Sequence, residues 1–155
     1  MSEQFMQRAI ALAIENVNLR GGGPFAAVIV KSGRIIAEGT NRVTSMNDPT
    51  AHAEIMAIRE ACRSVREFQL TGCDLYATCE PCPMCLGAIY WARLARVFYA
   101  GSAADAAAAG FDDGFIYDEF KRPAAARRIP MARVLRRESL AIFAAWKAKG
   151  DRVPY

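Results

Sequence analysis

The sequence predicts one α/β domain, residues 1–155, in which a mixed β-sheet of five strands lies between two layers of helices. Three patterns lead to this fold class: an early β-hairpin, a central strand, helix, strand series, and amphipathic helices around them. The 155 residues fit one domain, and no internal repeat or linker divides them. A composition of 53% hydrophobic and 23% charged residues is typical of a globular protein.

The first part of the chain predicts a helix and then a β-hairpin. Residues 3–19 carry apolar side chains at three- and four-residue spacing, and three consecutive glycines end this pattern. The apolar runs 24–30 and 35–39 flank a turn at residues 32–33, which favours two paired strands. The polar residues 41–47 predict a loop.

The middle of the chain predicts a helix and a parallel crossover unit. Residues 48–50 offer helix-capping side chains with a proline, so a helix is expected to begin near His52. The runs 75–79 and 97–100 are typical of buried strands, and residues 82–92 between them predict a helix. Such a series favours two parallel strands joined by a right-handed crossover.

The last third alternates weaker signals. Residues 102–109 are rich in alanine and predict a helix, whereas residues 111–117 predict a loop or short helix. We expect the fifth strand within residues 129–136 and a final amphipathic helix over 140–149, with Ser139 as its cap.

Composition narrows the functional classes. No apolar run approaches the roughly 18 to 20 residues of a membrane span, and the N-terminal residues lack the apolar region of a signal peptide. We therefore expect a soluble, cytoplasmic protein with no membrane partner. The net charge of +4 is uneven, since residues 1–120 carry 10 Lys/Arg and 14 Asp/Glu and residues 121–155 carry 10 and 2. The basic end fits a nucleic-acid partner, a subunit contact or a solvated surface.

The strongest functional signal joins the lone histidine to a cysteine pair. His52-Ala53-Glu54 stands at the predicted start of one helix, and Pro81-Cys82-Pro83-Met84-Cys85 stands at the start of the next. This is the H-x-E and P-C-x-x-C signature of zinc-dependent nucleobase deaminases. One imidazole and two thiolates suit zinc, and three protein ligands leave a fourth position for water, as in catalytic sites. Glu54 is then placed to hold that water rather than to bind the metal.

Other interpretations of the cysteines are simpler. A Cys-x-x-Cys pair also occurs in structural zinc sites and redox pairs, and Cys79 is the candidate fourth ligand of a structural site. A zinc-stabilised interaction module would need such a fourth ligand and would not need Glu54. Cys62 and Cys73 are expected to be small core residues.

Longer segments resemble a known family. GGPFAAVIVKSGRIIAEGTN, NDPTAHAEIMAIR, CEPCPMCLGAIYWAR, GFDDGFIYDE and the terminal tyrosine are similar to bacterial guanine deaminases, in the cytidine-deaminase-like superfamily. The resemblance implies a cytidine-deaminase-like fold, one Zn²⁺ per subunit, and hydrolytic deamination of guanine to xanthine and ammonia. It also implies a homodimer in which the segment of about 139–155 is exchanged between subunits. A frayed C-terminus is the simpler alternative for that segment.

The resemblance also implies a role for each matching residue. The implied residues are the zinc ligands His52, Cys82 and Cys85, the proton shuttle Glu54, the second acid Asp113 at the exocyclic amine, the substrate contacts Phe25, Asn41, Ala53 and Trp91, and the capping residue Tyr155. The residue types suit a planar polar base, which needs stacking surfaces and a few fixed donors and acceptors. Ordinary core packing for Phe25 and Trp91, a turn role for Asn41 and a loop or capping role for Asp113 remain the simpler alternatives.

Two other activities stay open at this point. A tRNA adenosine deaminase shares the metal motif and would use the basic C-terminal third, but no aromatic residues are interleaved with those basic residues to stack on bases, and GFDDGFIYDE and Tyr155 argue against it. A cytosine or triazine deaminase of the same superfamily is the other alternative. We therefore expect a small nucleobase, rather than a nucleic acid, as substrate.

Overall fold

The computed structural model describes the backbone of residues 2–155 and the side chains from Glu3 onward. The chain forms two compact units, one ending at Gly114 and the other spanning Phe115–Tyr155, and each is described by itself. The elements are, in chain order, α1 (Ser2–Asn18), β1 (Ala26–Lys31), β2 (Arg34–Thr40), α2 (Val43–Met46), α3 (Ala53–Val65), β3 (Cys73–Cys79), α4 (Pro83–Trp91), β4 (Arg96–Gly101), α5 (Ala103–Ala108), α6 (Gly114–Lys121), a 3₁₀ turn (Ala124–Ala126) and α7 (Arg136–Ala148).

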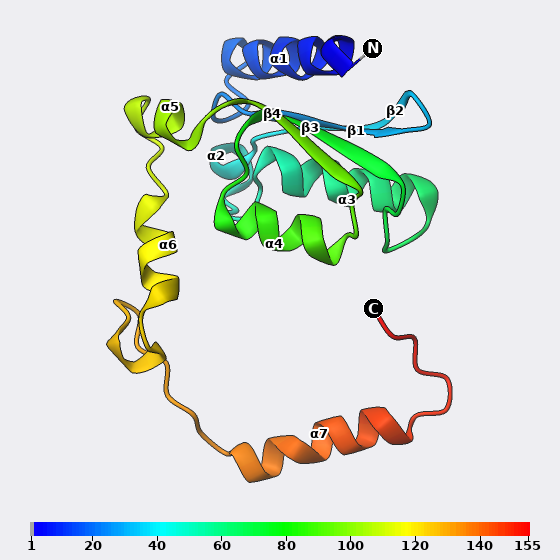
Figure 1. Ribbon diagram of the computed structural model, residues 1–155, viewed down its shortest axis with the longest axis vertical. Coiled ribbons are helices and arrows are strands. Elements are labelled where there is room, and N and C mark those ends of the chain that lie inside the picture. Colours follow the sequence, from blue (N-terminus) through cyan, green and yellow to red (C-terminus); the bar gives the residue numbers. More distant parts are fainter. Residues whose placement is uncertain (1) are drawn as a thin grey trace. The chain divides into compact units, whose positions relative to one another are not determined.

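The first unit is a three-layer α/β/α arrangement around a mixed sheet. The strand order is β2-β1-β3-β4, with β1 antiparallel to both of its neighbours and β3 parallel to β4. Helix α1 covers one face of the sheet, and α3 and α4 cover the other (Figure 1). The predicted hairpin, the crossover through α4 and the α/β fold class are confirmed.

Alternating side chains of β1 supply the core on both faces of the sheet. Ala27 and Ile29 are fully buried in the cluster with α3 and α4, whereas Val28 and Val30 are buried in the cluster with α1. Because side chains alternate along a strand, an uninterrupted apolar run is the pattern of a strand covered on both faces.

A close approach between β2 and α3 places the start of that helix. A Cβ atom at Gly39 would collide with the backbone carbonyl oxygen of Ala53 and the backbone nitrogen of Ala57. Glycine therefore lets the first turns of α3 lie directly on the sheet, which fixes the chain immediately after His52.

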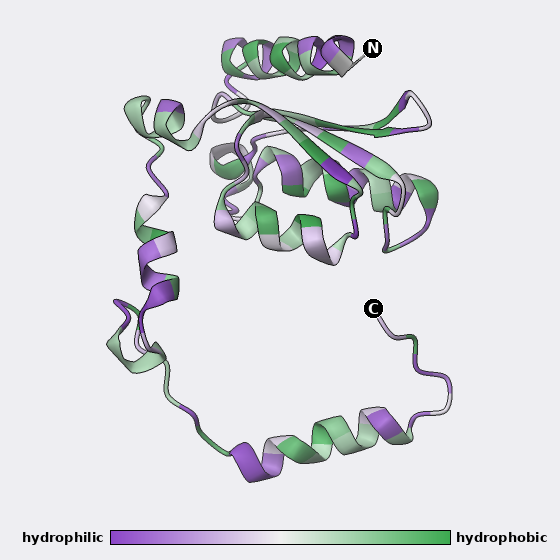
Figure 2. Cartoon of the chain, viewed as in Figure 1, coloured by the Kyte–Doolittle hydropathy of each residue, from purple (hydrophilic) through white to green (hydrophobic). Residues whose placement is uncertain are grey.

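The second unit contains α6, the 3₁₀ turn and α7, and α7 begins with polar residues that are followed by a mainly apolar stretch (Figure 2). The strand predicted within residues 129–136 is wrong, so the sheet has four strands instead of five. Residues 129–135 are irregular, with Ile129 81% exposed and Val134 78% exposed. Within its own unit this segment has no strand to pair with, and Pro130 lacks a backbone donor.

Two boundaries differ from the sequence predictions. The loop predicted at 41–47 contains the short helix α2. Helix α7 begins at Arg136, before the predicted cap Ser139, whose hydroxyl donates to the Arg136 carbonyl from within the first turn.

In the described part of the chain, no helix has the length and hydrophobicity required to cross a bilayer.

Candidate metal centre and active site

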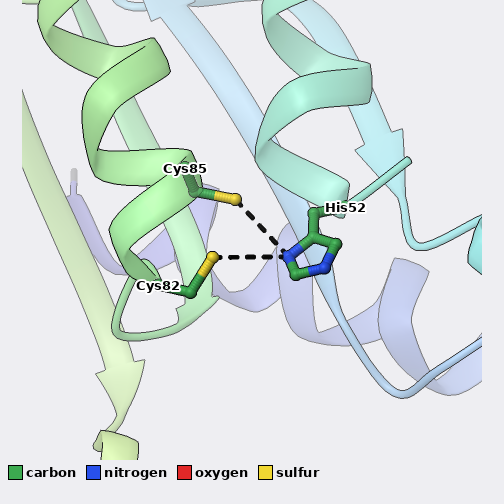
Figure 3. A group of neighbouring side chains, drawn as sticks. All are labelled: His52, Cys82 and Cys85. Atoms are coloured by element: carbon green, nitrogen blue, oxygen red, sulfur yellow. Dashed lines mark hydrogen bonds between the residues drawn. The ribbon is translucent and has the colours of Figure 1, made fainter. Parts of the chain in front are cut away.

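The side chains of His52, Cys82 and Cys85 converge on one point in the first unit. His52 Nδ1 lies 3.5 Å from Cys82 Sγ and 3.6 Å from Cys85 Sγ (Figure 3). The donor atoms of these three residues all lie within 4.8 Å of one another. The three ligands predicted from the spacing are therefore brought together by the fold.

Two helix entrances supply these ligands. His52 is the extended residue immediately before α3, and Cys82 occupies the same position before α4, with Pro83 opening the helix. Cys85 follows in the first turn of α4 and is fully buried. The unpaired backbone N–H groups and the dipole at a helix start favour negative charge, which suits the Cys82 sulfur at the entrance of α4.

The electrostatics of the three groups match a metal-binding set. The hydrogen bond from the Cys85 thiol, followed by the one with His52, lowers the pKa of Cys82 to about 4. The same contact with Cys82, together with burial, raises the pKa of Cys85. One imidazole and two thiols within such a distance fit zinc, whose sites take nitrogen and sulfur donors.

Cys79 is not part of this donor group. Its Sγ donates to the carbonyl oxygen of Ser102 at 3.5 Å. Among the residues described, the group that could hold a metal comprises only His52, Cys82 and Cys85. A set of three protein ligands is the arrangement of a catalytic zinc site rather than a closed structural one.

Glu54 lies beside the donor group without belonging to it. Its side chain is in the first turn of α3, and the residue is only 8% exposed. Cys85 Sγ donates to Glu54 Oε2 at 3.5 Å. Burial raises the pKa of the Glu54 carboxyl group, so this group can carry a proton more readily than an exposed glutamate.

A cavity of about 220 Å³ opens next to these groups. It is smaller than the roughly 300–1,000 Å³ of pockets for drug-sized ligands, so it suits a compact molecule. Its lining residues are Phe25, Asn41, Val43, His52, Ala53, Glu54, Cys79, Glu80, Cys82, Ala103, Ala106, Phe111 and Asp113. Seven residues of the predicted site therefore line one cavity.

The rim of this cavity combines an aromatic pair with a fixed amide. Phe25 and Phe111 meet edge to face with ring centroids 4.9 Å apart. Asn41 is 7% exposed, and its Oδ1 accepts from the backbone N–H groups of Gly23 and Val43, both at 3.2 Å. Burial, followed by the charge of Cys82, raises the pKa of Asp113 on the same cavity.

Some lining residues were not among the predicted site residues. Phe111 lies in the GFDDGFIYDE segment, but its contact with Phe25 spans 86 positions of sequence and leaves no local signal. Glu80 accepts from the backbone N–H of Ala103 at 3.1 Å and so connects the end of β3 to α5. Two alanines of α5, Ala103 and Ala106, also line the cavity. The alanine-rich sequence predicts a helix here but does not indicate that this helix contacts the cavity.

Two of the predicted substrate contacts, Trp91 and Tyr155, are exposed. Trp91 ends α4, is 67% exposed and is not among the cavity-lining residues. Tyr155 belongs to the second unit and is 73% exposed.

The architecture and the donor group define a class of protein. Residues 1–101 match the family described as the cytidine and deoxycytidylate deaminase zinc-binding region, and the chain belongs to this zinc-binding family. Over its whole length, the chain is similar to the guanine deaminase of Bacillus subtilis (strain 168), with 58% identity over 153 residues, covering 99% of this chain and 98% of that one.

A solved structure gives the same relationship. The crystal structure of guanine deaminase from Bacillus subtilis superimposes with a TM-score of 0.97 at 57% identity, covering 99% of this chain and 98% of that chain. The tRNA-specific adenosine deaminase of Agrobacterium fabrum is 46% identical over 95 residues, which cover 61% of this chain and 62% of its own. The similarity to guanine deaminase therefore extends over nearly the whole chain, whereas the second match covers about three fifths of it.

Proposed function

We propose that this protein is a guanine deaminase, which hydrolyses guanine to xanthine and ammonia. The observation that carries the proposal is the buried Glu54 carboxyl group, which contacts Cys85 and lines a cavity of about 220 Å³ together with His52 and Cys82. The similarity to the Bacillus subtilis enzyme over 99% of the chain supports guanine as the substrate.

The chemistry divides between the metal and the carboxyl group. His52, Cys82 and Cys85 would hold a zinc ion, which would supply Lewis-acid chemistry by making a water molecule more acidic, from a pKa of 15.7 to about 7. Glu54 takes a proton from the attacking water and delivers it to a ring nitrogen of the base, which we take to be N3. The water oxygen adds to C2, its second proton passes through a carboxyl group to the amino group, and the C2–N bond breaks to give the C2 carbonyl of xanthine and ammonia. The burial that raises the pKa of Glu54 suits a group that both accepts and returns a proton.

A second acid acts at the departing amine. Asp113 lines the same cavity, and burial raises the pKa of its carboxyl group above that of an exposed aspartate. We assign it, together with Glu54, to protonation of the exocyclic amino group. Phe25 and Ala53 pack against the base, and Asn41 offers its Nδ2 donors, because its Oδ1 already accepts two backbone hydrogen bonds.

The C-terminal segment completes the site in this proposal. The protein acts as a homodimer, with residues of about 139–155 exchanged so that Tyr155 closes the cavity of the other subunit, and Trp91 contributes to the pocket wall. This assignment rests on the family resemblance and on the exposure of Tyr155. The single domain over 1–155 and a cytoplasmic location stay predictions from the sequence.

A substrate panel tests the activity directly. Ammonia release is measured with zinc-loaded protein and guanine, cytosine, adenine, a triazine amine and tRNA in parallel reactions. We expect release from guanine that exceeds release from every other compound by at least an order of magnitude. Faster release from tRNA would identify an RNA deaminase, and faster release from cytosine or the triazine would assign the cavity to a smaller ring.

A further inference from the structure

Three polar or charged residues are buried among the described side chains, and one of them lies outside the cavity. They are Asn16, Asn41 and Glu54. Glu54 and Asn41 line the cavity, whereas Asn16 belongs to α1, the helix that covers the opposite face of the sheet. Burying a primary amide is costly unless its donors are satisfied, so the partners of Asn16 indicate what it does.

Both donors of the Asn16 side chain go to backbone carbonyl groups near the cavity. Asn16 Nδ2 donates to the carbonyl oxygen of Gly23 at 3.0 Å and to that of Asn41 at 3.0 Å. The backbone N–H of Gly21 donates to the Asn16 carbonyl oxygen at 2.8 Å. Asn16 therefore connects α1 to the loop of three glycines at residues 21–23 and to Asn41, which follows β2.

The contacts close into a ring of three residues. The backbone N–H of Gly23 donates to Asn41 Oδ1 at 3.2 Å, while the Gly23 carbonyl accepts from Asn16. A Cβ atom at Gly22 would collide with the Asn41 carbonyl, so the loop passes directly against this residue. Asn16 thus holds the loop that in turn holds the Asn41 side-chain oxygen.

We propose that Asn16 is a positioning residue for base recognition, which fixes the orientation of the Asn41 amide so that its Nδ2 group donates into the cavity. An amide that presents donors selects a purine with an acceptor at the facing edge, such as the 6-carbonyl of guanine. It disfavours a 6-amino group, which presents a donor instead. This inference rests on the proposed guanine deaminase activity. It adds Asn16, which does not line the cavity, to the residues that determine the selectivity for guanine.

The test measures selectivity between guanine and 2,6-diaminopurine, which differ at position 6 and share the 2-amino group that is removed. Asn16→Ala is compared with the wild type and with Asn18→Ala, a matched control at an exposed position of the same helix. We expect Asn16→Ala to raise KM for guanine about tenfold, as loss of roughly one well-placed hydrogen bond does. Zinc content and kcat should change less than twofold, and the guanine preference in kcat/KM should fall about tenfold.

A double-mutant cycle separates positioning from general stability. If Asn16 acts through Asn41, adding Asn16→Ala to an Asn41→Ala background leaves the guanine preference unchanged within about twofold. A lower Tm with an unaltered KM and guanine preference would overturn the proposal, as would an equal loss of activity toward both purines. Should Asn16→Ala not fold, Asn16→Ser, whose hydroxyl can keep one hydrogen bond, is judged by the same criteria at reduced temperature.

Two controls distinguish the positioning role of Asn16 from the deaminase activity itself. Ammonia release from guanine by the wild type and by Asn18→Ala establishes the activity regardless of how Asn16→Ala behaves. Absence of release by the wild type would defeat the proposed function itself. Unchanged selectivity in Asn16→Ala, with an active wild type, would defeat only the positioning role.

Discussion

The backbone N–H of Asn41 donates to the carbonyl oxygen of Phe25 at 3.0 Å. This hydrogen bond continues the β1–β2 ladder one step beyond the Ala26 and Thr40 pair. An aromatic ring and an amide on the cavity are therefore joined through the backbone. The hairpin, rather than side-chain freedom, sets the separation of these two groups.

Replacement of the buried carboxyl group tests the proton transfer. Glu54→Gln keeps the shape of the side chain but removes its capacity to accept a proton, so kcat should fall by about 10²- to 10⁴-fold. Zinc content, measured by atomic absorption, should stay at the wild-type level because Glu54 is not in the donor group. Glu67→Gln, at an exposed position after α3, serves as the control and should leave kcat unchanged. Wild-type turnover in Glu54→Gln would exclude the mechanism.

Two cysteines three residues apart should differ sharply in their effect on the metal. Cys82→Ser removes a thiol from the donor group, and we expect the purified protein to lose most of its zinc and its activity. Cys79→Ser changes a thiol that donates to Ser102 and should retain zinc at one equivalent per subunit. Loss of zinc from both variants to the same extent would argue for a four-ligand structural site.

The contact between β2 and α3 predicts a stability difference between two glycines. Gly39→Ala forces a methyl group against the backbone of Ala53 and Ala57, and overpacking of this kind costs about 1–3 kcal/mol. Gly87→Ala lies within α4, where an added Cβ meets no other atom, so it should stabilise the fold by up to about 1 kcal/mol. Urea unfolding followed by circular dichroism measures both. Equal free energies of unfolding for the two variants would contradict the packing argument.

Removal of the last residues tests the proposed cap. A protein lacking residues 153–155 should show a decrease of roughly tenfold in kcat/KM for guanine, the effect of losing about one favourable contact. A frayed tail would leave the kinetics unchanged.

A mixing experiment then distinguishes exchange between subunits from closure within one. The truncated protein, which keeps Glu54, is refolded together with full-length Glu54→Gln, which keeps Tyr155. If Tyr155 closes the partner's cavity, the mixture is more active than the sum of the two proteins alone. Simple additivity at every mixing ratio would show that Tyr155 does not act across the dimer.

The sequence predicted the metal centre better than the cavity wall. His52, Cys82 and Cys85 are identified by spacing, because each lies at or just inside a helix entrance whose capping and proline signals are local. The pairing of Phe25 with Phe111 depends on tertiary packing across most of the first unit, so no window of sequence reveals it. Helix α2 was missed since it has only four residues.

The failed strand prediction has a similar cause. Residues 129–136 have β-forming side chains such as Ile129 and Val134, but a strand requires a neighbour to accept its backbone hydrogen bonds. No strand lies within the second unit to serve as that neighbour. Four of the five predicted strands are therefore present. The fifth is absent because strand formation depends on a pairing partner as well as on local β-propensity.

The turn at Ser32 and Gly33 lies at the far end of the hairpin whose open end carries Phe25 and Asn41. Both turn residues have left-handed φ values, 49° and 74°, and a Cβ atom at Gly33 meets nothing. Five residue steps of β1 separate the turn from Ala26, about 17 Å at the usual rise per residue. The turn is therefore a permissive insertion point: an epitope or reporter peptide placed there should leave kcat and KM for guanine unchanged.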